Sequence, residues 1–293
     1  MFFLSFFQKS DNNAHCVYLS KNSDFYQVIK KDGSYEITVP FWIVSKIPLF
    51  LGKIQAGEYL IEYHETAFSV IIKILKNRSV TRKITIPEGY TSKRIVEKLN
   101  DNKNLTGTIS EIPEEASLFP STYFYKKGES KKSIIKKMQN KMKQVIEELF
   151  VDKDDAFIKN TIILASIVEK ETSIDHERPL VASVFKNRLK FNMRLQSDPT
   201  VVYAVSNRYG ILNRQLLRSD WKFESPYNTY KVKGLPPSAI CAPSYKSIMA
   251  VLSEISTDYL YFVASSDQKH HVFSKEYNTH VNNINYLKYS RNK

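Results

Sequence analysis

The chain has 293 residues, of which 42% are hydrophobic and 13% aromatic, so it is long enough to bury one large core or two smaller ones. Only 8 Gly and 11 Pro exclude collagen-like and Pro/Gly-rich disordered chains, and two cysteines are too few for a disulfide framework. The net charge of +13 favours an anionic partner, such as a polyanion, a lipid headgroup or a carboxylate-rich polymer, without choosing among them.

The first 31 residues contain no recognisable transmembrane anchor. The opening MFFLSFF segment lacks the basic region and the small-residue cleavage site of a signal peptide. The apolar stretch at 39–52 has fewer residues than the roughly 18–20 that a membrane helix needs, so we expect it in a core or at an interface. On this basis any membrane contact should be electrostatic and released by salt.

Strands are predicted to alternate with helices in the next part of the chain, as a small α+β module. Alternating hydrophobicity predicts strands at 35–39, 59–63 and 83–87. Amphipathic stretches that follow them predict helices at 41–50, 68–75 and 92–99. Gly57 and Gly89 fall where turns are expected, and Thr66 and Thr91 are suited to cap helices.

Two long helices are predicted after this module. Ser130 opens a lysine-rich helix that runs to Phe150 with its apolar residues on one face. A second helix begins near Asp154 and runs through IKNTIILASIVEKETS, and we expect it at the centre of the fold because it is apolar on most sides. The segment 186–243 has the composition of functional loops. A buried strand at 259–265 and a terminal helix are expected to follow.

Glu169 and Glu171 lie near the end of the apolar helix. Two residues correspond to about 200° of rotation, so the two side chains leave the helix on opposite sides and cannot form a carboxylate pair. Each shares its face with apolar residues, which would raise the pKa of the carboxyl and keep it protonated near neutral pH as a general acid. Helix geometry does not choose between them, and a carboxylate held by Lys or Arg is the alternative for either.

Two clusters of polar and aromatic residues in the loops fit a sugar ligand. They are Arg194, Gln196, Ser197, Asp198 and Thr200, and Tyr227, Asn228, Thr229 and Tyr230. Their donors and acceptors can match the hydroxyls of a sugar while aromatic rings pack on its CH faces. The alternative is that these side chains only brace their own loops. The histidines show no metal-ligand spacing, so we expect neither a metal nor a cofactor.

Six collinear segments carry a family resemblance. They are LASIVEKET (164–172), VASVFKNRL (181–189), MRLQSDPTVVY (193–203), SPYNTY (225–230), GLPP (234–237) and YLYFVAS (259–265). Together they resemble the MltG/YceG-like endolytic murein transglycosylases. The earlier AGEYLIEY and KITIPEGYTSKRIVEKL are similar to the LysM-like region of that family, so the resemblance extends over most of 32–290.

The resemblance implies an α+β protein, in which a LysM-like module at 32–103 precedes a mixed α/β catalytic domain at 104–293. It implies cleavage within the glycan strands of peptidoglycan, leaving 1,6-anhydro-N-acetylmuramyl ends and limiting strand length during wall synthesis. Catalysis falls on Glu171, the second Glu of the E-K-E-T motif, which first donates and then accepts a proton. The residues we assign to substrate binding are Gln196, Ser197, Asp198, Thr200, Tyr227, Asn228 and Tyr230.

The partners expected from the resemblance are peptidoglycan glycan strands and, in addition, peptidoglycan synthases. Nucleic acid is not expected, because only the net charge points to it. Members of the family carry an N-terminal transmembrane helix, which this sequence does not show. The resemblance therefore places the protein in the cell envelope, at the inner membrane facing the periplasm, with no visible anchor.

Three serines depart from the family pattern. Ser121 replaces the Asp of the FPDTY segment, and Ser238 and Ser244 replace glycines. A serine does not favour the positive φ that glycine allows, so these loops could differ and activity could be reduced. Two alternatives to the transglycosylase follow: a peptidoglycan-binding scaffold without turnover, and a hydrolase that uses Glu171 with Asp198.

Overall fold

The computed structural model describes residues 7–9, 15–19, 35–37, 57–62, 67–265 and 270–291. The chain separates into two compact units. Unit 1 contains 1–84, 103–107 and 124–130, and unit 2 contains 85–102, 108–123 and 131–293. The limits predicted from the sequence, 1–31, 32–103 and 104–293, are not tested by these units and stay a prediction.

The described residues of unit 1 include two antiparallel strand pairs and a helix, together with parts of β5 and β6. Strand β1 (Phe7–Lys9) pairs with β3 (Tyr35–Ile37), and β2 (His15–Leu19) pairs with β4 (Gly57–Ile61). Helix α3 (Ala67–Leu75) follows, which confirms the helix predicted at 68–75. The predicted helix at 41–50, the apolar stretch at 39–52 and the proposed cap Thr66 lie outside the described residues.

Gly57 was predicted in a turn, and this is wrong, because it is the first residue of strand β4. A Cβ atom at Gly57 would lie 2.9 Å from Cβ of Ser79. The glycine is therefore explained by a close approach of two segments. Gly89, in contrast, lies in a turn with φ of +71°, as expected.

Strands β5 (Thr81–Thr85) and β6 (Thr122–Lys126) form a two-stranded sheet. Helix α4 (Ser92–Asn100) begins after the predicted cap Thr91, whose side chain accepts a hydrogen bond from the backbone N–H of Arg94. Helix α5 (Lys131–Leu149) buries the apolar face that the sequence indicated and exposes most of its lysines.

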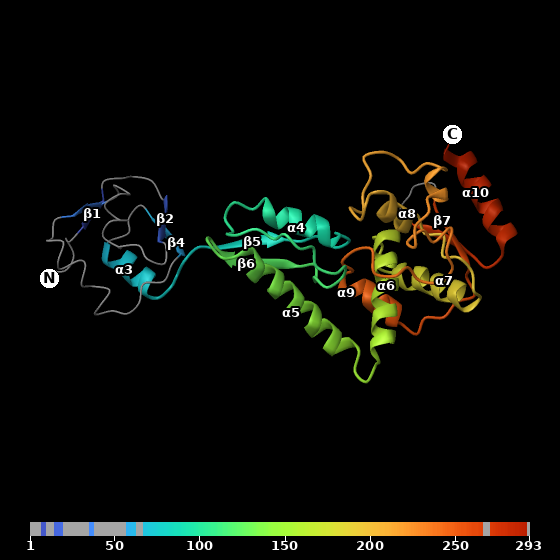
Figure 1. The fold of residues 1–293 in the computed structure, drawn as a ribbon, viewed down its shortest axis with the longest axis horizontal. Helices are drawn as coiled ribbons and strands as arrows, with labels where there is room; N and C mark the ends of the chain where they lie inside the picture. The colour runs from blue at the N-terminus through green and yellow to red at the C-terminus, as the bar shows by residue number, and fades with distance from the viewer. Residues whose placement is uncertain are drawn as a thin grey trace. The chain divides into compact units, whose positions relative to one another are not determined.

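Helix α6 (Asp155–Glu171) is the centre of unit 2, as predicted. Its N-cap Asp154 accepts a hydrogen bond of 2.7 Å from the backbone N–H of Phe157, and every residue from Thr161 to Val168 is buried. Helix α6 packs against three other helices, α7 (Arg178–Lys190), α8 (Asp198–Val205) and α9 (Tyr245–Leu252) (Figure 1).

The C-terminal part contains a 3-10 turn, η1 (Asp220–Lys222), a hairpin and a helix. Strands β7 (Tyr261–Ala264) and β8 (His271–Ser274) are antiparallel, and α10 (Tyr277–Arg291) packs on both. The prediction of a buried strand was wrong, since every residue of β7 is only half-buried. A two-stranded sheet leaves each strand with an unpaired edge, so β7 cannot be enclosed from both sides.

The turn that contains Gly89 joins α6 and the segment before α9. The N–H of Gly89 donates to the carbonyl of Ala242, and the N–H of Ala242 donates to the carbonyl of Tyr90. A Cβ atom at Gly89 would lie 3.3 Å from Cδ of Lys170 in α6. This backbone pairing supports the end of α6, where the two glutamates lie. None of the helices in the described part of the chain combines the length and the apolarity that a membrane span requires.

Candidate active site

Glu171 is the last residue of α6, and its side chain is half-buried. The hydroxyl of Ser197 donates a hydrogen bond of 2.5 Å to Oε1 of Glu171. Burial raises the pKa of Glu171 to about 7, and the negative charge of Asp198 acts in the same direction. The Ser197 hydrogen bond and the positive charge of Arg188 oppose this rise. Glu171 is therefore close to half protonated at neutral pH and can both donate and accept a proton.

Asp198 is exposed and is held by two aromatic side chains. Its Oδ1 accepts hydrogen bonds from Nε1 of Trp221 at 3.0 Å and from the hydroxyl of Tyr230 at 2.7 Å. The rings of Trp221 and Tyr230 are stacked, with centroids 5.3 Å apart and planes inclined by 13°. Burial, followed by the contact with Asp198, raises the pKa of Tyr230, so its hydroxyl remains a donor. The Asp198 carboxylate thereby holds the stacked rings of Trp221 and Tyr230 as a flat surface next to Ser197.

Arg188 of α7 organises the loop that carries Ser197. The side chain is buried and donates to the carbonyls of Leu195 at 2.9 Å and Leu260 at 2.7 Å. It also donates to Oε1 of Gln196 at 3.2 Å, so Gln196 is connected to the site through this arginine. Gln196 itself has φ of +52°, an unfavourable backbone conformation for a residue with a Cβ atom.

Thr200, Asn228 and Thr229 have no exposed surface and brace the loops from within. The hydroxyls of Thr200 and Thr229 are 2.8 Å apart, and that of Thr229 accepts from the N–H of Ser197. The amide of Asn228 donates to the carbonyls of Trp221 and Phe223. In the structure described here these side chains position Ser197 and Trp221, which is the alternative that the sequence left open for such residues.

Tyr227 lies apart from this group. Its hydroxyl is 2.8 Å from that of Ser238, and its ring lies 5.0 Å from the ring of Tyr203. Of the predicted site residues, the structure therefore brings together Glu171 with Ser197 and Asp198 with Tyr230. Gln196 is exposed and is linked to the site through Arg188. Thr200 and Asn228 are buried beneath the site, and Tyr227 packs on Tyr203 of α8.

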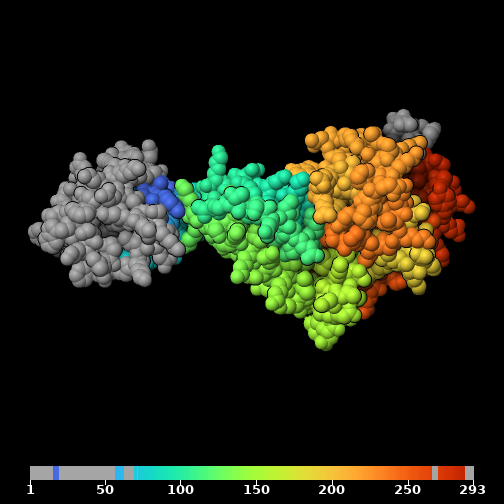
Figure 2. Space-filling view, viewed as in Figure 1, coloured from blue at the N-terminus to red at the C-terminus, as the bar shows by residue number. Residues whose placement is uncertain are grey.

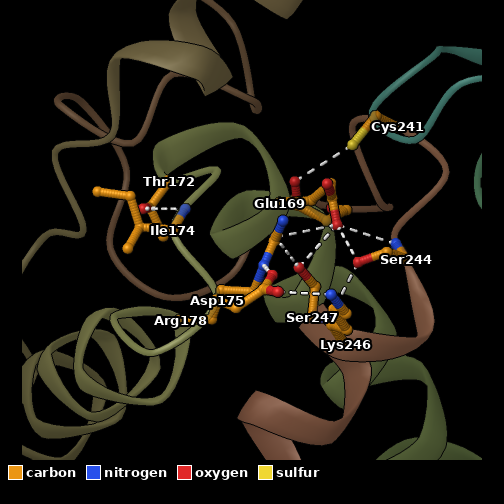
Figure 3. Close-up of polar contacts among 10 residues, drawn as sticks. Glu169, Thr172, Ile174, Asp175, Arg178, Cys241, Ser244, Lys246 and Ser247 are labelled. Carbon is orange, nitrogen blue, oxygen red and sulfur yellow. Dashed lines mark hydrogen bonds and ion pairs between the residues drawn. The ribbon is translucent and has the colours of Figure 1, made fainter. Parts of the chain in front are cut away.

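Glu169 has an entirely different environment (Figure 3). Its Oε2 accepts hydrogen bonds from the N–H of Ser244 at 2.9 Å, from the hydroxyls of Ser244 and Ser247 at 2.5 and 2.7 Å, and from Arg178 at 3.2 Å. The side chains of Glu169 and Arg178 are 6% and 5% exposed, so this is a buried ion pair. Glu169 is thus a carboxylate held by an arginine, and it ties α6 to α7 and α9.

The structure shows the surroundings of the three serines that depart from the family pattern, and it gives Ser244 a defined role. Neither Ser238 nor Ser244 adopts a positive φ, so neither is strained by the absence of glycine. Ser244 is the N-cap of α9, accepting from the N–H of Ser247, and it donates to Glu169. Ser121 is exposed, and its carbonyl accepts from the N–H of Ile86.

Sequence reasoning missed Trp221 and Arg188. Trp221 is one of only two tryptophans in the chain and lies in the loop-rich segment 186–243, which was a usable signal for a sugar-binding aromatic. Arg188 gave no signal, because it looks like any arginine at the end of an amphipathic helix. Within the described residues no group of three or more His, Cys, Asp or Glu side chains could hold a metal ion.

The chain is similar to known proteins over most of its length. The YceG-like family model matches residues 18–286. The endolytic murein transglycosylase of Bacillus subtilis (strain 168) is 34% identical, and the alignment covers 87% of this chain and 74% of that protein. The endolytic murein transglycosylase of Streptococcus pneumoniae (strain D39) is 27% identical over 69% of this chain and 44% of that protein.

A solved structure agrees with these sequence relationships. The crystal structure of a yceG-like protein from Listeria monocytogenes aligns with a TM-score of 0.58 and 26% sequence identity. The alignment covers 93% of this chain and 99% of that one.

Proposed function

Because the chain belongs to the YceG-like family, we propose that it is an endolytic peptidoglycan transglycosylase that uses Glu171 as its single acid and base. It cuts glycan strands internally, leaves 1,6-anhydro-N-acetylmuramyl ends and limits strand length during wall synthesis. The observation that carries this proposal is the difference between the two glutamates. Burial raises the pKa of Glu171 to about 7, whereas Glu169 is occupied by four hydrogen bonds.

In the first step protonated Glu171 donates its proton to the oxygen of the glycosidic bond. A buried carboxyl with a pKa near the working pH is protonated in a large fraction of molecules and is still acidic enough to give up the proton. Its position at the C-terminal end of α6 also disfavours the negative charge, since that end of a helix carries partial negative charge. As the bond breaks, positive charge develops on the sugar.

In the second step the Glu171 carboxylate takes the proton of the muramyl 6-hydroxyl as that oxygen attacks the anomeric carbon. The hydroxyl of Ser197, 2.5 Å away, stabilises the carboxylate between the two steps. Glu171 ends protonated, as it began, and no water is consumed. Asp198 lies next to Ser197 and contributes negative charge that stabilises the developing positive charge of the sugar.

Substrate binding is proposed to rest on the outer residues of the site. Trp221 and Tyr230 offer a stacked aromatic surface for a sugar ring, and Asp198, Ser197 and Gln196 offer polar groups for its hydroxyls. The predicted roles of the buried Thr200 and Asn228 become positioning roles in this proposal. Tyr227 has no substrate contact in this proposal, because its hydroxyl bonds to Ser238 and its ring packs on Tyr203.

We further propose that residues 32–103 are a LysM-like module that holds the glycan strand, and that 104–293 supply catalysis. The order of β4, α3, β5 and α4 in the described part of the module supports this assignment. The protein acts in the cell envelope, at the periplasmic face of the inner membrane. Its substrate there is nascent peptidoglycan, and its partners are the peptidoglycan synthases. A net charge of +13 suits an anionic, peptide-bearing polymer.

Mass spectrometry of purified glycan strands after incubation with the protein tests the proposal. We expect products with anhydro-muramyl ends that lack the mass of an added water. Reducing-end muramic acid as the main product would identify the hydrolase that uses Glu171 with Asp198. Unchanged strands that nevertheless bind the protein would identify the scaffold.

A further inference from the structure

A pocket separate from the proposed active site lies in unit 2, between the segment after α4 and the end of α8. Its volume is about 440 Å³. The residues that line it are Lys93, Ile112, Pro113, Glu114, Glu115, Tyr203, Asn207, Arg208 and Ser238. In Figure 2 the green segment that contains residues 108–120 and the orange segment that contains residues 200–245 adjoin on one surface. The proposed catalytic mechanism uses none of these residues.

Two cationic side chains face this pocket without a salt bridge. Arg208 is exposed, and its guanidinium lies 5.9 Å from the ring of Tyr227. The ammonium group of Lys93 lies 5.7 Å from the centroid of the Tyr209 ring. Neither forms an ion pair with another residue in the described part of the chain. Arg214, in contrast, is paired with Asp220.

The backbone presents Arg208 in an unusual way. Asn207 and Arg208 both have positive φ, of +52° and +65°, directly after the C-cap of α8. The N–H of Arg208 donates to the carbonyl of Tyr203, which closes the end of the helix. Two consecutive non-glycine residues in this conformation are unfavourable. Both residues line the pocket.

Glu115 forms the inner wall of the pocket and does not neutralise the cations by direct contact. Its two oxygens accept hydrogen bonds from the N–H of Ser92 at 2.8 Å and from the hydroxyl of Tyr203 at 3.2 Å. Burial raises the pKa of Glu115, although these hydrogen bonds and the charge of Arg208 oppose the rise. Both oxygens of Glu115 are therefore engaged by Ser92 and Tyr203, and neither forms an ion pair with Arg208 or Lys93 in the described part of the chain.

The remaining walls are mixed, and they include apolar side chains, a hydroxyl, the side chain of Asn207 and the exposed carboxylate of Glu114. Ile112 is 53% exposed, although it is a large apolar side chain, and Pro113 follows it. Opposite them Ser238 presents a hydroxyl that is 2.8 Å from the hydroxyl of Tyr227. Charges of both signs, a small apolar wall and a hydroxyl together suit a short peptide that carries carboxylates, an amino group and methyl groups.

We propose that this pocket binds the peptide stem of the peptidoglycan strand, with Arg208 and Lys93 on its free carboxylate. The inference rests on the proposed function, because it names a further part of the same substrate. Tyr203 follows Asp198 by five residues on α8, which is about 7.5 Å along the helix axis. A stem attached to a sugar in the active site can span such a distance. The pocket makes the protein prefer strands that carry peptides over bare strands.

The test compares cleavage of glycan strands that carry stem peptides with cleavage of the same strands after an amidase has removed the peptides. Arg208→Gln should lower the rate on peptide-bearing strands by about tenfold and leave the rate on bare strands unchanged. Lys93→Gln should have a smaller effect of the same kind. Lys98→Gln removes the same charge from α4 outside the pocket and should change neither rate.

A binding measurement decides the proposal independently of catalysis. Calorimetric titration with N-acetyl-L-alanyl-γ-D-glutamyl-L-lysine should show binding to the natural chain and about tenfold weaker binding to Arg208→Gln. The same peptide with its carboxylates amidated should bind neither the natural chain nor the Arg208→Gln variant. An unchanged ratio of rates, or equal binding of both peptides, overturns the pocket assignment. Absence of cleavage by the natural chain, with selective peptide binding retained, overturns the proposed function alone.

Discussion

The hydroxyl of Ser197 lies 2.5 Å from Oε1 of Glu171 and donates its hydrogen bond to that oxygen. A donor aimed at a carboxylate stabilises the charged form and lowers its pKa. Burial and the neighbouring Asp198 act in the opposite direction, and together they leave the pKa of Glu171 at about 7. Two adjacent residues therefore adjust the same carboxyl in opposite senses, which gives a sharp test of the assignment.

Ser197→Ala and Asp198→Asn should shift the pH dependence of kcat/KM in opposite directions. Cleavage requires protonated Glu171, so the rate should fall as the pH rises above about 7. Loss of the Ser197 hydroxyl raises the pKa of Glu171 and moves this fall to higher pH. Loss of the Asp198 charge lowers the pKa and moves the fall to lower pH. An asparagine oxygen can still accept from Trp221 and Tyr230, so the aromatic pair is kept. Shifts in the same direction would contradict the assignment.

Glu171→Gln should abolish cleavage, because an amide can neither donate the proton nor take it back. Glu169→Gln should retain far more activity per folded molecule, since the glutamine oxygen can replace Oε2 as the acceptor for Ser244 and Ser247. It should lower the free energy of unfolding by about 1–3 kcal/mol, because Arg178 loses its buried charged partner. Activity assays and denaturant unfolding of both variants provide the comparison. If Glu169→Gln were inactive and Glu171→Gln active, the catalytic role would belong to Glu169 and the assignment would be wrong.

Glu171→Gln should also stabilise the fold above pH 7. The pKa of this carboxyl is raised from 4.5 to about 7 in the folded chain, so the folded state holds the proton more tightly than the unfolded state. The resulting cost begins above pH 4.5, grows until about pH 7 and is constant beyond. At about 1.4 kcal/mol per pH unit it reaches roughly 3 kcal/mol. Urea unfolding at pH 4 and pH 8 should show a gain for the variant only at pH 8.

Ser244→Gly should destabilise the protein, although glycine is the residue of the family pattern. The substitution removes the side-chain cap of α9 and one hydroxyl donor to the buried Glu169. We expect a loss of about 1 kcal/mol in the free energy of unfolding. Ser238→Gly is the matched control, because among the described residues its hydroxyl bonds to Tyr227 and to the carbonyl of Ala239 and does not reach Glu169. An equal effect of the two substitutions on the melting temperature would show that the Glu169 contact contributes nothing.

Trp221→Ala should raise KM for glycan strands several-fold with a smaller change in kcat, because the ring is proposed to hold a sugar. Trp221→Phe keeps an aromatic face without the hydrogen bond to Asp198 and should have an intermediate KM. Phe191→Ala removes a ring that is 61% exposed outside the site and serves as the control. If Trp221→Ala and Phe191→Ala have the same KM as the natural chain, the aromatic surface does not bind substrate.

Several elements could be predicted from the sequence because their causes are local. Periodic apolar residues predicted α4 and α5, and a long apolar run after Asp154 predicted α6. The caps Thr91 and Asp154 follow from side chains that bond within three residues. Both glutamates were identified as candidates because the apolar faces of α6 were evident. The strand at 259–265 was correctly located but wrongly expected to be buried, since burial depends on what packs on it.

Tertiary structure alone distinguished Glu171 from Glu169, because their surroundings come from segments distant in sequence. Ser244 and Ser247 reach Glu169 from α9, whereas Ser197 reaches Glu171 from the loop before α8. The resemblance assigned the catalytic role to Glu171, and no periodicity within α6 could have done so. The roles of Trp221 and Arg188 depend in the same way on long-range contacts. A helix determines the direction in which its side chains leave, but only the folded chain determines which charges and donors they meet.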